Sequence, residues 1–156
     1  MKENVFDALM YMVEYADGQV RFIDNRDEYS EILDQEGFSE MEVDRAFHWL
    51  EGLQSFVNSF QKLQESSKSA YRHFMPEEED VFDIESRELL FSLESQGIID
   101  ELMREIIIDR AVALGEVRKI DSIRLKWLML IVLYNLPGKE AELAWVERWE
   151  NNANLH

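Results

Sequence analysis

Apolar residues recur along most of the chain at intervals of three and four positions, the spacing of one face of an α-helix. The first such stretch predicts a helix over Asn4–Tyr15. A second predicted helix is capped by Asp24 and ends at Gly37, because glycine adopts the left-handed C-terminal conformation without a Cβ penalty. Phe38 follows and is expected to pack back against this helix.

The third predicted helix has a distinct beginning. Ser39 and Glu42 have the S-x-x-E spacing of a capping box, in which each side chain accepts a hydrogen bond from the other residue's backbone N–H. The helix is expected to run to about Phe60. Its apolar stripe consists of Val43, Phe47, Leu50 and Leu53.

The second half of the chain predicts further helices. One starts with Pro76 in its first turn and ends near Gly97, and another runs from Asp100 to Gly115. The segment Ile123–Leu136 is apolar around its whole circumference, which is typical of a helix surrounded by protein on every side. Asp121 is its expected cap. Pro137-Gly138 breaks it before a last amphipathic helix.

These patterns predict an all-α protein of six or seven helices. We expect an N-terminal helical unit of three helices over residues 1–62, a Ser-rich linker over 63–75, and a C-terminal bundle over 76–152 around the Ile123–Leu136 helix. The same helices also suit one compact domain, so both arrangements stay open.

Composition narrows the classes of function. The 156 residues include 33 Asp and Glu against 16 Lys and Arg, a net charge of −17, which disfavours a general binder of phosphate backbones. No cysteine is present, so disulfides, thiolate catalysis and cysteine metal sites are excluded. The first residues lack the apolar run of a signal peptide, and Ile123–Leu136 is shorter than the roughly 20 residues of a membrane span. A cytoplasmic location is expected.

The second and third helices have the pattern of a helix-turn-helix around Gly37-Phe38-Ser39. In that motif the first residues of the second helix contact base edges. Here those residues are Glu40, Glu42 and Asp44, whose carboxylates would face phosphates. A scaffold element with this shape is therefore favoured over a DNA-reading one, and duplex DNA is not the expected partner.

A basic cluster extends from the segment after the fifth predicted helix into the start of the sixth, and it is the second candidate site. It is suited to a phosphate or an acidic segment, although balancing neighbouring acids is the favoured role. Lys126 interrupts an apolar helix, so we expect it to reach solvent or to pair with a carboxylate. Trp49 is a candidate partner anchor, but on an amphipathic helix a core position is favoured. The cluster consists of Arg118, Lys119, Arg124 and Lys126.

The sequence shows no recognisable set of catalytic residues. His48, His73 and His156 are not spaced as metal ligands on one helix, and there is no Gly-rich phosphate loop or G-x-S-x-G elbow. No catalytic, cofactor or metal residue is predicted, and an enzyme ranks last among the hypotheses.

The order and spacing of several short pieces resemble the Smg family, a group of bacterial proteins of unknown function. Met75 departs from the family pattern, which has Thr before Pro-Glu-Glu and so would provide an N-cap. The resemblance implies a bacterial cytoplasmic protein and brings no reaction or cofactor. The pieces are Phe6-Asp7-x-Leu9-Met10-Tyr11, Gly37-Phe38, Ala46-x-x-Trp49-Leu50-Glu51-x-Leu53, Pro76-Glu77-Glu78, Leu93-Glu94, Arg104-Glu105-x-x-Ile108-x-Arg110, Leu125-Lys126-Trp127, Asn135-x-Pro137-Gly138-x-Glu140 and Leu155-His156.

Two functional hypotheses remain. The first is a non-enzymatic interaction module whose acidic helical surface binds a basic protein. The second is a nucleic-acid-associated protein that acts through the helix-turn-helix-like pair or through the Arg118–Lys126 cluster. The sequence indicates no oligomeric state.

Overall fold

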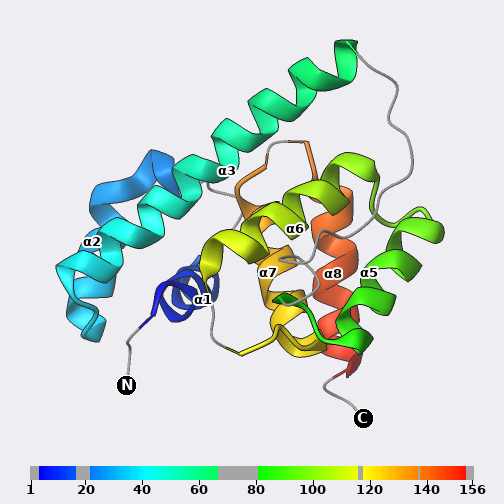
Figure 1. Cartoon of the computed structure of the whole chain (residues 1–156). Helices are drawn as coiled ribbons and strands as arrows, with labels where there is room; N and C mark the ends of the chain where they lie inside the picture. The colour runs from blue at the N-terminus through cyan, green and yellow to red at the C-terminus, as the bar shows by residue number, and fades with distance from the viewer. Residues whose placement is uncertain (1–3, 17–21, 67–80, 116–117, 137, 154–156) are drawn as a thin grey trace. The chain divides into compact units, whose positions relative to one another are not determined.

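The protein is all-α in the computed structural model (Figure 1), as the sequence predicts. The structure describes residues 4–16, 22–66, 81–115, 118–136 and 138–153, with residues 60–66 and 150–153 described as backbone only. Within these ranges there are seven α-helices and no strand; the nearest approach to one is an isolated bridge between Phe82 and Ile120. The helices are α1 (Val5–Tyr15), α2 (Arg26–Glu36), α3 (Glu40–Ser66), α5 (Ile84–Ser95), α6 (Glu101–Leu114), α7 (Ser122–Tyr134) and α8 (Glu140–Ala153).

Contacts between backbone positions group the chain into two compact units. The first unit comprises Met1–Glu51 and Lys126–His156, and the second comprises Gly52–Leu125. Helices α3 and α7 each contribute residues to both units. Most of the predicted linker at 63–75 lies outside the described residues, although α3 continues to Ser66, so the division at that segment stays a prediction.

Three of the predicted caps, Ser39, Asp100 and Asp121, are confirmed. Glu42 N–H donates to Ser39 Oγ (3.1 Å) and Ser39 N–H donates to Glu42 Oε1 (3.3 Å), which is the reciprocal pair of a capping box. Asp100 Oδ1 accepts from Met103 N–H at 2.8 Å, and Asp121 Oδ1 accepts from Arg124 N–H at 2.8 Å. These local signals therefore fix the starts of α3, α6 and α7.

The end of α2 also follows its sequence signal. Gly37 has a φ of 105°, the left-handed region in which a glycine has no steric penalty. Phe38 N–H donates to Leu33 O at 3.0 Å, and the Phe38 side chain is buried. The chain thus turns within Gly37, Phe38 and Ser39 and enters α3 directly.

One predicted helix start is wrong. Asp24 does not cap the second helix, because it lies in a short 3₁₀ turn, η1 (Ile23–Asn25), and α2 begins at Arg26. The reason is a tertiary contact: buried Phe22 donates its N–H to Asn135 Oδ1 (2.9 Å), which holds the chain immediately before this turn.

In the region of the fourth predicted helix, the structure describes α5, which begins at Ile84 with Asp83 as its cap. Ile120 N–H donates to Val81 O (2.7 Å) and Asp83 N–H donates to Ile120 O (3.2 Å), so the backbone around Phe82 is engaged in a bridge and not in a helix. The predicted first turn at 76–80 lies outside the described residues.

The apolar helix α7 is buried without interruption from Leu128 to Leu133, as predicted for its centre. Leu128 and Ile131 have no exposed surface, and Asn135 just beyond its end is 5% exposed. Asn135 Nδ2 donates to Ile131 O at 2.7 Å while its Oδ1 accepts from Phe22 N–H. A buried polar side chain therefore joins the end of α7 to the segment before α2, within the first unit.

Buried arginines on α6 characterise the second unit. Arg104 Nη1 donates to Glu94 Oε2 at 2.6 Å, which ties α6 to α5, and Arg104 also pairs with Glu105. Arg110 pairs with Asp109 at 2.7 Å. Its guanidinium lies so close to α3 that a Cβ on Gly52 would be only 2.6 Å from Arg110 Nη1. A glycine inside α3 is thus explained by the close approach of Arg110.

Candidate functional site

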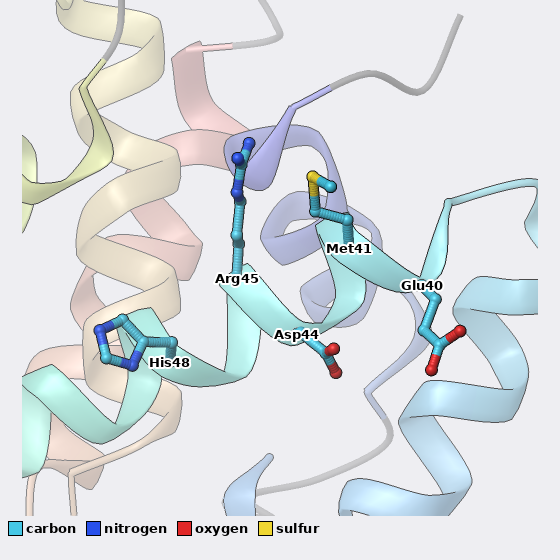
Figure 2. Close-up of a pocket in the computed structure, with 5 residues that line it drawn as sticks. All are labelled: Glu40, Met41, Asp44, Arg45 and His48. Carbon is cyan, nitrogen blue, oxygen red and sulfur yellow. The ribbon is translucent and has the colours of Figure 1, made fainter.

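The start of α3 carries a hollowed, exposed surface. Five side chains from its first two turns line a depression of about 500 Å³ (Figure 2). We call this surface the α3 face, and it consists of Glu40, Met41, Asp44, Arg45 and His48. All five belong to the first unit.

The α3 face combines apolar and charged side chains. Met41 is 60% exposed, although the opposite side of the same helix carries the buried stripe of Val43, Phe47 and Leu50. Figure 2 shows Met41 and Arg45 on one side of the helix and the carboxylates of Glu40 and Asp44 directed away from them. A ligand on this face would meet an apolar thioether beside two carboxylates.

Arg26, the first residue of α2, reaches across to α3. Its Nη2 lies 3.4 Å from Asp44 Oδ1, and its Nη1 lies 3.5 Å from Glu51 Oε1. The guanidinium carbon stands 4.8 Å from the centre of the Phe47 ring, within the range of a cation–π contact. One arginine therefore partly balances two carboxylates of α3.

The predicted basic cluster is distributed over both units. Arg118, Lys119 and Arg124 belong to the second unit, whereas Lys126 belongs to the first. Arg118 and Lys119 are exposed, and Arg124 is half-buried in the first turn of α7. The four residues of the predicted cluster therefore do not belong to a single compact unit.

Lys126 is half-buried and contacts an aromatic ring, a partner that the sequence did not indicate. Its Nζ lies 4.2 Å from the centre of the Trp149 ring on α8, so the interaction is a cation–π contact within the first unit. Trp149 in turn packs against Trp145, with ring centres 5.3 Å apart. The aromatic ring gives the ammonium group of this lysine a favourable contact within an apolar helix.

Trp49 is 4% exposed on α3. An indole buried to this extent is not accessible to a partner, which supports the core position favoured by the sequence. Sequence reasoning overlooked Met41 and Arg26. Met41 had a signal, because it is an apolar residue off the buried stripe of its helix. Arg26 had none, because its contacts depend on how α2 and α3 meet.

The described part of the chain offers neither a metal centre nor a membrane span. No group of three or more His, Asp or Glu side chains there is placed to hold a metal ion. No helix in those ranges is long and apolar enough to cross a membrane. His73 and His156 lie outside the described residues.

Comparison with known proteins identifies the family. Residues 5–154 match the model of a family described as protein of unknown function (DUF494). The chain is 40% identical over 148 residues to a protein named Protein Smg homolog from Nitrosococcus oceani, covering 94% of this chain and 92% of that protein. Homologues with the same name from Stenotrophomonas maltophilia and Methylococcus capsulatus are 39% and 40% identical over the same shares of each chain.

No solved structure matches this chain. The family model covers nearly the whole sequence, and the relatives align along most of their own length. The resemblance in the short motifs is thus confirmed: the chain belongs to the Smg (DUF494) family, an uncharacterised family whose matched homologues come from bacteria.

Proposed function

We propose that the protein is a non-enzymatic interaction module of the bacterial cytoplasm that binds a basic protein through the α3 face. The observation that carries the proposal is Met41, which is 60% exposed and lines a hollow of about 500 Å³ together with Glu40 and Asp44. An exposed apolar side chain bordered by charge is typical of a protein-binding surface.

The expected energetics divide between two kinds of contact. Burial of a methionine side chain contributes about 1.5–3 kcal/mol to association, because apolar surface is removed from water. The carboxylates of Glu40 and Asp44 select the sign of the partner's charge. The net charge of −17 steers basic proteins towards the module and speeds their encounter, an effect that salt weakens.

A nucleic-acid-associated role is the second candidate. The observation that favours it is the short turn of Gly37, Phe38 and Ser39 between α2 and α3, which suits a helix-turn-helix. The chemistry of the exposed side of α3 opposes it, because Glu40 and Asp44 occupy the positions where that motif contacts DNA. We therefore rank this role below binding of a basic protein.

The proposal is tested by affinity capture from a bacterial lysate with matched variants. Glu40→Gln/Asp44→Asn removes two charges from the α3 face. Glu85→Gln/Glu88→Gln removes two exposed charges from α5 in the second unit and serves as the control. Mass spectrometry should identify basic proteins with the wild type and the control, and these should be lost with the α3 variant.

Each other result contradicts the proposal. Equal loss in both variants would mean that net charge matters and the α3 face does not. Recovery that nuclease treatment abolishes would favour the nucleic-acid-associated role.

A further inference from the structure

Arg26 lies where a helix disfavours it. The first turn of a helix carries the positive end of the helix dipole, so a cation at the first residue of α2 is repelled by the backbone. The side chain of Arg26 extends instead to α3, where Asp44 and Glu51 accept its guanidinium.

The place that Arg26 occupies matches the chemistry of a guanidinium. A flat ring, Phe47, lies under the group, and two carboxylates lie at its edges on the same side of α3. Stacking on an aromatic face combined with edge contacts to carboxylates is the mode that distinguishes arginine from lysine. We call Asp44, Phe47 and Glu51 the guanidinium seat.

Arg26 is held loosely in this seat. Both ion pairs are long, at 3.4 and 3.5 Å, and the side chains of Arg26, Asp44 and Glu51 are 46%, 64% and 58% exposed. Ion pairs of this length and exposure contribute little to stability, because water solvates both charges. A second cation can therefore displace Arg26 at low cost.

The seat and the α3 face are continuous, because Asp44 belongs to both. Phe47 lies six residues beyond Met41, about 9 Å along the axis of α3, so one extended partner segment can reach both. We propose that Arg26 is an internal competitor in a receptor site for a partner's arginine. The partner segment then carries an apolar side chain for Met41 and an arginine that replaces Arg26.

The inference rests on the proposed function and defines its partner: a protein segment rich in arginine and not in cations generally. It also assigns Arg26 a regulatory role, because this side chain lowers the affinity of the site for basic ligands. Removing Arg26 should therefore strengthen binding.

The test uses fluorescence anisotropy with fluorescein-labelled octa-arginine and octa-lysine and the full-length protein. Arg26→Ala empties the seat. Arg148→Ala removes the same charge from an exposed position on α8 of the first unit and is the matched control. Circular dichroism verifies that each variant is folded, and Arg26→Gln is the second variant if Arg26→Ala is not.

We expect Arg26→Ala to bind octa-arginine about five-fold more tightly than the wild type, the factor that corresponds to releasing weak surface ion pairs. Arg148→Ala should change this affinity less than about two-fold. Octa-lysine should gain less than octa-arginine in Arg26→Ala, and adding Phe47→Leu should remove the arginine preference because the ring is gone.

The outcomes separate the two proposals. If the wild type binds octa-arginine but Arg26→Ala gains no more than Arg148→Ala, the competitor role is overturned while the proposed function stands. Equal gains in affinity for octa-lysine and octa-arginine would also overturn the proposal that the guanidinium seat selects arginine. If neither the wild type nor Arg26→Ala binds either peptide, both proposals fail.

Discussion

Asn135 uses both ends of its side chain in buried hydrogen bonds. Its Oδ1 accepts from Phe22 N–H and its Nδ2 donates to Ile131 O, with 5% of the residue exposed. Replacing it leaves a backbone N–H and a carbonyl group with one partner fewer in a place where water does not substitute easily. Such a loss costs the desolvation of the orphaned group in addition to the hydrogen bond.

Asn135→Ala should therefore lower the free energy of unfolding by about 1–3 kcal/mol. Asn58→Ala is the control, because Asn58 is exposed on α3, where its Oδ1 accepts a hydrogen bond from Gln54. It should change stability by no more than about 0.5 kcal/mol. Chemical denaturation measures both, and similar losses would show that the Asn135 bridge is not important.

The ionisation of Tyr29 should make the stability of the fold depend on pH in the alkaline range. Burial, followed by the negative charge of Glu28, raises the pKa of Tyr29 above its ordinary value of 10.0. A group whose pKa is raised in the folded state contributes stability that is fully present below its unfolded pKa and is lost as pH rises through its folded pKa. The loss therefore begins above about pH 10.

Tyr29→Phe should reduce the fall in melting temperature between about pH 9 and pH 11, because the variant has no proton to lose there. Part of the fall should remain, since a hydrogen bond with Glu36 also raises the pKa of Tyr11. An unchanged slope in Tyr29→Phe would refute the role of this phenol.

Among the helices, the starts of α3, α6 and α7 were predictable because a cap is local: the capping residue and the N–H that it accepts are three positions apart. The starts of α2 and α5 were not. Each depends on a partner far along the chain, Asn135 for Phe22 and Ile120 for the backbone beside Phe82. Periodicity within a window carries no information about such partners.

The buried helix α7 provides a direct stability test. Leu128 is fully buried at its middle, so Leu128→Ala should lower the free energy of unfolding by about 2–5 kcal/mol through lost transfer energy and a cavity. Ile123 lies on the same helix but is 64% exposed. Ile123→Ala should change stability by no more than about 0.5 kcal/mol, and equal effects in thermal unfolding would contradict the burial of α7.

Helix α3 contains a glycine where alanine would ordinarily stabilise a helix by about 1 kcal/mol. In Gly52→Ala that gain should be absent, because the new Cβ would lie 2.6 Å from Arg110 Nη1, and Arg110 is held by Asp109. In an Arg110→Ala background the space is free, so Gly52→Ala should stabilise by about 1 kcal/mol. A double-mutant cycle measures this coupling, and simple additivity would argue against it.

At the scale of the whole molecule, the net charge determines how weakly the protein should bind DNA. With a net charge of −17, the protein should bind duplex DNA more weakly than the Kd of about 10⁻⁴–10⁻⁶ M of ordinary non-specific binding. A fluorescence-anisotropy titration at two salt concentrations checks this. Micromolar binding that weakens with salt and disappears in Arg124→Ala/Lys126→Ala would favour the nucleic-acid-associated role over the acidic module.

The sequence predicted the fold class and the family, and it singled out the start of α3, where the candidate site lies. Through Glu40 and Asp44, it also predicted that this surface carries negative side chains. It did not reveal the guanidinium seat, because Arg26 and Glu51 are separated by 25 positions and meet only when α2 and α3 pack. Nor did it reveal that the first and last segments of the chain belong to one unit, which is a matter of tertiary contacts.

That discontinuous unit has a consequence for synthesis on the ribosome. Residues Met1–Glu51 emerge first, but Lys126–His156, which complete their unit, emerge last. At about 5–20 residues per second, the delay between the two segments is on the order of 4–15 s. Throughout that interval α1 and α2 lack the buried side chains of α7 and α8, so the apolar side chains of Phe6 and Leu9 are candidates for protection by a chaperone until translation ends.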